Sequence, residues 1–547
     1  MPDKITTQRV VCEGGLYSNE NHILLSERLP GSATRLLNYE VSLAGGYRRI
    51  NGYTKFDANY SEVGTGVSEG PILGLAIFVT NAGSTEYLAA RKLSSGTTYK
   101  WYKFQSGVGW NAITLPITMN TTDTYRTVTR IRSSQFNFGV GNTIIFVDGV
   151  NNAITYDGTT WGNIDVADTG ADLAHAGGAQ ALAKPAVVTV YQNHIFMANQ
   201  YANPSVIAHS APNVYFNWTS ASGAGQLISS AEVVQLKPQR DTNYVFGSNS
   251  IQKIDVDSTG AFLIKDVTRN IGCIAPDTVV EIGGDIMFLS PDGFRPVAGT
   301  SRIGDVEIET ISKPIQLLIA DIIEDTNIKD MNVVAVRNKS QVRFFYGGDD
   351  LERATSFGII GGLRLGEAGQ SNVQWEWGRL LGIRANVATS EYVNGREIII
   401  HGDFDGKVYL QESGNNFDGD DILSVFSPPY LDQGDTEIRK NYRTINYFMR
   451  PEGSVEVGLS LSFDWGDNGT AIPVNFEGLL VGFPTIYGGS GVLYGSAESI
   501  YGGINPNLRF NINGSGYSMR PSLVVFGDYP PHSIQGISIE FTPNDRV

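Results

Sequence analysis

The chain has 547 residues, which is enough for three or four domains of ordinary size or for one large repeat architecture with additions. Hydrophobic residues make up 41% and charged residues 18%, which argues against disorder, while 63 Gly with 25 Tyr and 25 Phe favour a turn-rich β protein. The net charge of −16 argues against a surface that grips nucleic acid through clustered Lys and Arg, although it allows a channel through which nucleic acid slides.

The N-terminal sequence lacks the basic and then apolar segments of a signal peptide, and no apolar run is long enough to span a bilayer as a helix. Cys12 and Cys273 lie too far apart in sequence to outline a disulfide framework or a zinc site. We therefore expect a soluble protein with two free thiols that is made in a reducing cytoplasm.

Residues 1–60 show no regular pattern and are predicted to form an N-terminal arm. Beyond them, short runs of β-branched and aromatic residues, each closed by Gly, Asn or Asp, predict strands. Clear examples are Ile72–Thr80, Asn142–Gly149, Asn193–Asn199, Asp285–Gly293, Gln341–Gly348 and Arg396–Gly402.

A two-strand unit recurs, in which a strand with paired Val residues is followed by a polar turn and a strand that carries an aromatic residue. Copies begin about 50 residues apart, at Val187, Val233, Val279 and Val333, with related units near Ile72, Tyr125 and Gly382. Four-stranded units at this period are typical of β-propellers, because a small sheet buries both faces when blades stack radially. We predict an all-β fold with a β-propeller of about seven blades over residues 61–415; a series of β-sandwiches is the competing interpretation.

One segment departs from the strand pattern. Between Thr310 and Asn327, Ile and Leu residues recur at helical spacing, and Pro314 suits a first helical turn. We predict a helix inserted between two blades, near residues 310–327.

After about residue 415 the strands become longer and alternate apolar with polar residues, which predicts a C-terminal antiparallel, sandwich-like β-domain over residues 416–547. Within it, Tyr487, Tyr494 and Tyr501 stand seven residues apart in a Gly-rich stretch, residues 486–506. The glycines exclude a coiled coil despite the heptad spacing. Three turns in an exposed loop are the better interpretation.

Residues that perform catalysis or bind metals do not cluster in this sequence. No HExxH, GxSxG, phosphate-binding loop or CxxC motif occurs, and paired carboxylates of the glycosidase type are not evident. The His residues are isolated from one another, at His22, His175, His194, His209, His401 and His532. We predict no catalytic residue, no cofactor and no required metal, and hence no enzyme.

Two Asp-rich turns are the metal candidates. Asp255–Gly260 (DVDSTG) resembles the start of a calcium-binding loop, but Asp266 stands where such a loop carries Glu, and a hairpin turn is the alternative. Phe417–Asp421 (FDGDD) gathers three acidic residues that could hold a cation, with an Asp-Gly turn as the alternative.

Three segments carry a family resemblance. In Ile271–Val297, a Gly-Cys-x-Ala-Pro turn enters a strand pair that ends in an Asp-Gly turn, and Gly402–Ile422 leads out of the last predicted blade. The first segment, Leu36–Asp57, has as its core residues Asn38, Gly45, Gly46, Tyr47, Arg48, Arg49, Gly52 and Tyr53. Taken in chain order, the three segments resemble the tail nozzle proteins of short-tailed bacteriophages, also called tail tubular protein B or packaged-DNA stabilisation proteins.

The resemblance implies a structural virion protein of the phage tail, assembled in the cytoplasm of the bacterial host. Six copies would form a ring-shaped nozzle below the portal and adaptor, which extends the channel for double-stranded DNA and helps to retain and eject the genome. The implied partners are further copies of the chain, the adaptor (head-to-tail connector) and tail fibre or tail needle proteins, while DNA passes without specific binding. The Tyr-Gly repeat departs from the family pattern.

Residues 45–53 of the first segment are the candidate site, an interface to another subunit or to the adaptor. Its glycines permit close backbone approach, its tyrosines offer large apolar area with a polar tip, and its arginines suit bidentate pairing with carboxylates of a neighbour. The candidate interface residues are Gly45, Gly46, Tyr47, Arg48, Arg49 and Tyr53. The alternative is that this segment is the first turn of the propeller, with both tyrosines in the core.

Two other functions remain open on the sequence. A receptor- or glycan-binding tail module would stack sugars on exposed aromatic residues such as Trp375 and Trp377, which share one face of a strand, although core packing explains them equally. A tail-associated glycan hydrolase is the third alternative.

Overall fold

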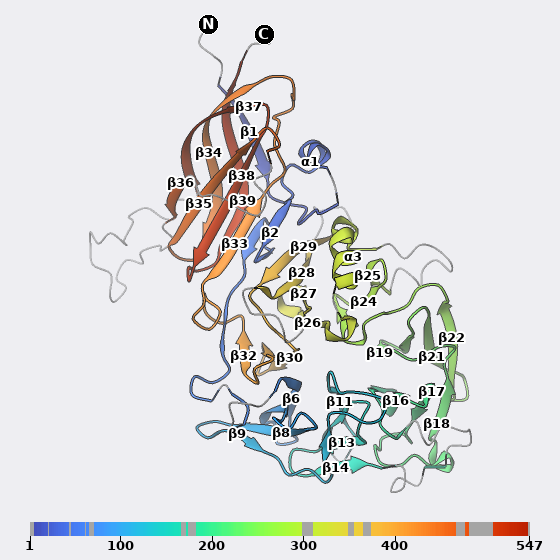
Figure 1. The fold of residues 1–547 in the computed structure, drawn as a ribbon. Coiled ribbons are helices and arrows are strands. Elements are labelled where there is room, and N and C mark those ends of the chain that lie inside the picture. The colour runs from blue at the N-terminus through green and yellow to red at the C-terminus, as the bar shows by residue number, and fades with distance from the viewer. Residues whose placement is uncertain are drawn as a thin grey trace.

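The structure is a computed structural model that describes residues 5–544 except 20, 43–44, 61, 65–69, 140, 166–170, 173–181, 298–309, 326, 348–354, 365–373, 467–475 and 481–506. The described strands form two bodies, a ring of small sheets and an elongated pair of packed sheets, and the first and last described strands, β1 (Thr6–Val11) and β39 (His532–Pro543), lie paired in the second body (Figure 1). The predicted all-β fold is confirmed. None of the described helices is long and apolar enough to cross a membrane.

In the described residues, six sheets and the part of a seventh, nine-stranded sheet from β26 (Asn332–Val336) to β29 (Gln374–Leu381) follow one another around the ring, and neighbours contact each other in cyclic order until β30 (Val387–Val393) meets β6 (Ile72–Val79). The chain therefore forms a seven-bladed β-propeller, and the competing series of sandwiches is wrong for this region. Blades 1 and 2 contain β6, β7 (Thr85–Lys92), β8 (Thr98–Gln105), β9 (Gly109–Ala112) and β10 (Met119–Asn120), then β11 (Arg132–Asn137), β12 (Asn142–Val147), β13 (Ala153–Tyr156) and β14 (Trp161–Ile164).

The remaining blades follow in chain order, except that the last strand of blade 7 comes from the N-terminal region. Blades 3 and 4 contain β15 (Val187–Tyr191), β16 (His194–Gln200), β17 (Asn203–His209) and β18 (Gly225–Ile228), then β19 (Gln235–Gln239), β20 (Thr242–Phe246), β21 (Ile251–Val256) and β22 (Phe262–Thr268). Blades 5 to 7 contain β23 (Val280–Ile282), β24 (Asp285–Ser290) and β25 (Gly293–Pro296), then β26 (Asn332–Val336), β27 (Gln341–Phe345), β28 (Phe357–Arg364) and β29 (Gln374–Leu381), and finally β30, β31 (Arg396–Gly402), β32 (Val408–Gln411) and β5 (Tyr53–Lys55).

The paired-Val repeat corresponds to the inner hairpin of four blades, β15–β16, β19–β20, β23–β24 and β26–β27. Buried apolar side chains fill the space between each blade and the next, so each small sheet is covered on both faces, and the cluster between blades 5 and 6 continues into the core of the C-terminal domain. This explains why strands such as β12 are almost continuously apolar, since both sides of the strand are buried.

The predicted insertion between blades 5 and 6 is confirmed as the helix α3 (Gln316–Asp325), which follows the 3-10 turn η4 (Lys313–Ile315). Its buried side chains, Ile319 and Ile322, join the apolar cluster that contains Phe294 of blade 5 and Phe344 of blade 6. The other described helical elements are α1 (His22–Arg28) and the short turns η2 (Ser220–Ser222), η3 (Pro276–Thr278), η5 (Ile328–Asp330) and η6 (Arg337–Lys339).

The C-terminal domain is a sandwich, as predicted. One layer is a six-stranded sheet, and the facing layer is the C-terminal half of a nine-stranded sheet, with a shared apolar core between them. Alternating burial along the strands follows from this, because one face meets the core and the other meets solvent. The strands are β33 (Ile422–Ser427), β34 (Lys440–Pro451), β35 (Val455–Phe463), β36 (Phe476–Leu480), β37 (Asn507–Gly516), β38 (Met519–Gly527) and β39 (His532–Pro543). The Tyr-Gly repeat lies outside the described residues.

Residues 1–60 are not a separate arm, because their strands belong to three different sheets. β1 (Thr6–Val11), β3 (Tyr39–Val41) and β4 (Tyr47–Arg49) lie in the six-stranded sheet, and β5 completes blade 7. β2 (Arg35–Leu37) pairs in parallel with β29 and antiparallel with β33, which joins blade 6 to the sandwich as one nine-stranded sheet. The boundary expected near residue 60 therefore does not separate a domain.

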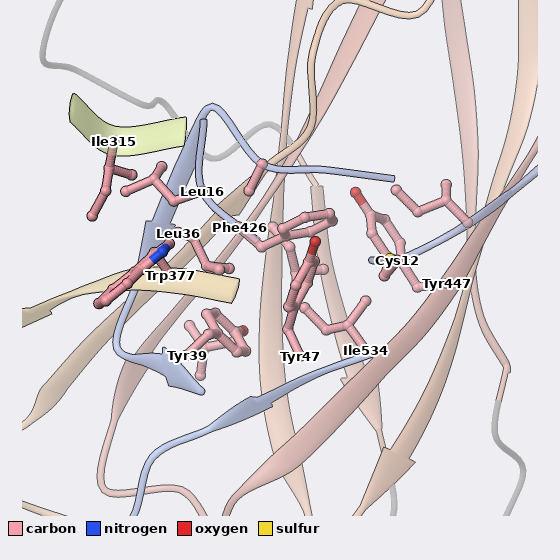
Figure 2. Close-up of a cluster of buried hydrophobic side chains, with 14 of the residues drawn as sticks. Cys12, Leu16, Leu36, Tyr39, Tyr47, Ile315, Trp377, Phe426, Tyr447 and Ile534 are labelled. Carbon is pink, nitrogen blue, oxygen red and sulfur yellow. The ribbon is translucent and has the colours of Figure 1, made fainter. Parts of the chain in front are cut away.

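Both cysteines are free and buried, Cys12 in the sandwich core (Figure 2) and Cys273 between blades 4 and 5. Burial raises the pKa of both thiols, to about 12 for Cys273. We predict that a thiol reagent at neutral pH leaves the native protein unlabelled and labels both residues after unfolding in guanidinium, measured by intact mass. Rapid labelling of the folded protein would contradict this environment.

Candidate functional site

Residues 45–53, hereafter the junction segment, run from the sandwich, where Figure 2 shows Tyr47, to blade 7, where β5 begins at Tyr53. β4 is hydrogen-bonded to β3 on one side and to β39 on the other, with Tyr47 opposite both Val41 and Ile534. Gly46 adopts a φ of +78°, and a Cβ there would lie 2.0 Å from the carbonyl oxygen of Ile534. A side chain at position 46 is therefore excluded by the neighbouring backbone.

Tyr47 is fully buried in the core of the sandwich. Its hydroxyl donates to the carbonyl of Gly31 and accepts from the amide of Gly15, both at 3.0 Å. The ring packs against Phe426 of β33, with ring centroids 5.4 Å apart. Tyr47 thus ties the backbone at Gly15 and Gly31 to the sandwich core.

Tyr53 is buried at the other end of the segment, between blades 6 and 7. Its hydroxyl donates to the carbonyl of Gly382 at 3.1 Å, and its ring stacks on Phe417 with centroids 4.9 Å apart. His401 packs edge-on against the same ring at 5.0 Å. The FDGDD turn therefore supplies an aromatic partner to the segment, through Phe417.

Arg49 is buried without a carboxylate at ion-pair distance among the described residues. Its guanidinium donates to the hydroxyl of Ser424 at 3.2 Å, to the carbonyl of Gly527 at 2.6 Å and to the carbonyl of Tyr529. Burial lowers its pKa below the usual value for arginine. The side chain joins the junction segment to the β33–β38 pair through neutral acceptors.

Arg48 makes a bidentate contact with a carboxylate, as expected for an arginine, but this carboxylate belongs to the same chain. Its Nε and Nη2 lie 2.6 and 2.8 Å from the two carboxylate oxygens of Glu452, and Nη1 lies 2.9 Å from Glu40. Burial alone would lower the pKa of Arg48, and the two carboxylates outweigh this and raise it.

Glu40 is the centre of a buried ion network that connects three parts of the molecule. Besides Arg48, its carboxylate contacts Lys339 at 2.8 Å and Arg343 at 3.5 Å, both from blade 6. Lys339 and Arg343 also pair with Glu412, which follows β32 of blade 7. Burial alone would raise the pKa of Glu412, but these two cations hold it well below its usual range.

The interface hypothesis is therefore wrong for three of its residues, since Tyr47, Arg49 and Tyr53 have buried side chains whose polar atoms bond within the chain. Arg48 also has its partners inside the chain, and Gly46 faces the β39 backbone. Gly45 has no atom near its Cβ position and occupies a turn with a φ of +88°. The alternative, in which the segment is the first turn of the propeller, correctly predicts that both tyrosines are buried. Tyr47, however, lies in the core of the sandwich and not in the propeller.

Sequence reasoning missed the ion network, because Glu40 lies 299 residues from Lys339 and 303 residues from Arg343 in the sequence. Glu40, Lys339, Arg343 and Glu412 come together only when the N-terminal strands return to blades 6 and 7. The one available signal was the GGYRR motif, which marked the correct segment without indicating its partners.

The other candidate sites are explained by local structure. Asp257 accepts hydrogen bonds from the Thr259 amide and hydroxyl and from the Ala261 amide, so DVDSTG forms the turn between β21 and β22. Trp377 is buried and stacks on Phe294, which removes it from any sugar-binding surface. In the described ranges no group of three or more His, Cys, Asp or Glu is placed to hold a metal ion, and His175 lies outside them.

Comparisons with known proteins return folds only. No family model and no curated protein matches the sequence. Among solved structures, the chain is similar to Hsv2 of Kluyveromyces lactis with an altered loop 6CD, at 11% identity over 57% of this chain and 98% of that chain, with a TM-score of 0.26. It is also similar to an ancestral GH74 enzyme at 10% identity over 68% of this chain and 53% of that chain, with a TM-score of 0.38. At these values the likeness says nothing of what this chain binds or does.

Replacing the two arginines separately tests their different environments. We predict that Arg49→Met lowers the free energy of unfolding by about 3 kcal/mol, because buried acceptors lose their donor. Arg48→Met is the matched variant and is expected to cost about 1 kcal/mol, because Glu40 keeps Lys339 and Arg343 as partners and Glu452 is half exposed. Guanidinium unfolding curves measure both values, and equal losses would contradict the assignment.

His532 makes the junction sensitive to acid. Its Nε2 lies 2.9 Å from the Tyr39 hydroxyl, and burial, with repulsion from Arg49, lowers its pKa to about 3. The unfolded chain takes up this proton near pH 6.5, so stability falls as the pH drops from about 6.5 toward 3, by about 1.4 kcal/mol per pH unit.

We predict that His532→Gln removes this contribution from the slope of unfolding free energy against pH between 6.5 and 5. The slope is independent of any constant loss of stability caused by the substitution itself. An unchanged slope in the variant would mean that His532 titrates normally in the folded protein.

Proposed function

We propose that this chain is the nozzle subunit of a short-tailed phage tail, a structural protein that assembles with copies of itself into a ring below the head-to-tail connector. The observation that carries the proposal is the junction itself. The residues that give the sequence its family resemblance, Asn38, Gly46, Tyr47, Arg48, Arg49, Gly52 and Tyr53, hold the propeller and the sandwich together.

A rigid junction suits a protein that bears load while DNA leaves a pressurised head. Asn38 illustrates this, since its side-chain amide donates to the carbonyls of Leu381 in blade 6 and Leu423 in the sandwich at 3.0 and 2.9 Å. Gly52 packs so closely on Asn416 that a Cβ would lie 1.9 Å from its carbonyl oxygen. Two domains joined by buried backbone pairing move as one body, whereas a flexible linker would let them rotate independently.

The charge of the chain agrees with a conduit for DNA. Each copy carries a net charge of −16, so a ring of copies repels the phosphate backbone and lets the duplex pass without adhering. Assembly in the bacterial cytoplasm agrees with two buried free thiols.

A glycan- or receptor-binding module is the second candidate, and one exposed feature favours it. Tyr125 and Tyr201 stack with ring centroids 4.2 Å apart and 11° between their planes, and both are exposed. The Arg126 guanidinium lies 5.6 Å from the Tyr201 ring centroid. An exposed aromatic pair is suited to stacking against a sugar ring.

Imaging separates the two candidates. We predict that the purified chain, mixed with the connector protein of the same virus, forms closed rings whose opening admits a DNA duplex, observed by electron microscopy and counted by mass photometry. A chain that stays monomeric with the connector, and that binds oligosaccharides in a manner abolished by Tyr125→Ala with Tyr201→Ala, would replace the nozzle with the second candidate.

A further inference from the structure

The inner strands of the propeller surround two adjoining cavities, with volumes of about 470 and 290 Å³. Both are lined by Arg132 and Ser133 of β11 and by Gln235 and Lys237 of β19, so they share one wall. Cavities of this size accept small molecules. Apolar side chains such as Val188, Leu236 and Val279 complete the wall of the larger one.

Positive charge is concentrated here, although the chain as a whole is strongly acidic. Among the described residues, the smaller cavity is lined by Arg130, Arg132, Lys237 and Arg337, and by one acidic residue, Asp277. Asp277 is already used, because Arg132 holds both of its carboxylate oxygens at 2.6 and 2.8 Å, and Arg130 approaches at 3.3 Å. The local charge is therefore clearly positive in a chain whose net charge is −16.

The other cationic side chains of this cavity differ in how many hydrogen-bond and ion-pair partners they have. Arg130 also donates to the carbonyls of Asn386, Met331 and Asp330 at 2.6 to 2.8 Å, which makes it structural. Arg337 contacts the Ser390 hydroxyl at 3.3 Å and Glu397 at 3.8 Å, at the rim of the same cavity.

Lys237 has neither a hydrogen bond nor an ion pair with any described residue, although it is partly buried in the shared wall. Burial lowers the pKa of the Lys237 ammonium group. Glu281 raises this pKa, whereas Arg337 lowers it. Because no described carboxylate lies at ion-pair distance from this partly buried ammonium, an anion bound in the cavity stabilises its charged form.

We propose that the axial cavity of the propeller binds a small molecule through an oxyanion group, phosphate or carboxylate, held by the Lys237 ammonium. Arg337 adds long-range attraction, and the Ser133 hydroxyl, which is exposed in the cavity wall, is available as a neutral donor. The apolar wall receives the remainder of the molecule.

Binding of inorganic phosphate and of acetate to the whole chain tests the proposal, by calorimetry at low ionic strength with chloride as the reference anion. We expect saturable binding of at least one of the two oxyanions at one site per chain, and at least tenfold weaker binding by Lys237→Gln. The relative affinities of phosphate and acetate identify the oxyanion class. Lys265→Gln is the matched control, since Lys265 lies in the same blade, is exposed and pairs with Asp255, and it should bind like the unmodified chain.

Thermal unfolding provides a second readout that does not depend on affinity. Without oxyanion, Lys237→Gln should unfold at the same or a higher temperature than the unmodified chain, because it removes an unpaired charge, and added phosphate or acetate should stabilise only the chain that keeps Lys237. Equal stabilisation of both chains, equal stabilisation by chloride, or a lower midpoint for Lys237→Gln would overturn the proposal. The measurement uses the isolated chain, so its outcome is separate from ring formation.

Discussion

One short stretch of backbone has to satisfy three sheets at once, and the rest of the structure depends on this constraint. Between residues 35 and 55 the chain bridges blade 6 and the sandwich through β2, enters the six-stranded sheet through β3 and β4, and completes blade 7 through β5. A slip of one residue in any of these strands would turn its side chains to the opposite face. The register is instead fixed by close approaches at Gly46 and Gly52, where neighbouring carbonyls leave no room for a Cβ.

The consequences extend to both domains. Blade 7 is completed by β5 from the N-terminal region, so β32 is paired on both sides. Arg48 and Glu40 then place one carboxylate among three cations at the meeting point, and charges withdrawn from water in this way are tolerable only when each has a partner. Lys237 in the axial cavity is an exception, because no described carboxylate lies at ion-pair distance from it and Glu281 acts on it only from farther away.

The sequence predicted the parts of the fold that repeat or have a strong period. The paired-Val units appear as inner hairpins, the Ile and Leu spacing appears as α3, and the C-terminal alternation appears as β34 and β37. The N-terminal strands escaped prediction because β2 to β5 are only three residues long, and such strands owe their existence to the sheets that receive them. The interface hypothesis for residues 45–53 was wrong for a related reason. The GGYRR motif alone is equally typical of an exposed contact and of a buried joint, and only the surrounding sheets decide between the two.

The central claim is that the junction unites propeller and sandwich into one cooperative body, and native-state hydrogen exchange tests it most directly. The amide of Ile50 donates to Asn38 at 3.1 Å and that of Tyr53 donates to Asn416 at 3.1 Å, so both report on the junction. The account predicts that these amides exchange only through the same global unfolding that exposes Phe146 in the interior of blade 2. Exchange at Ile50 and Tyr53 through a local opening of much lower free energy, while Phe146 stays protected, would show that the two domains are merely tethered.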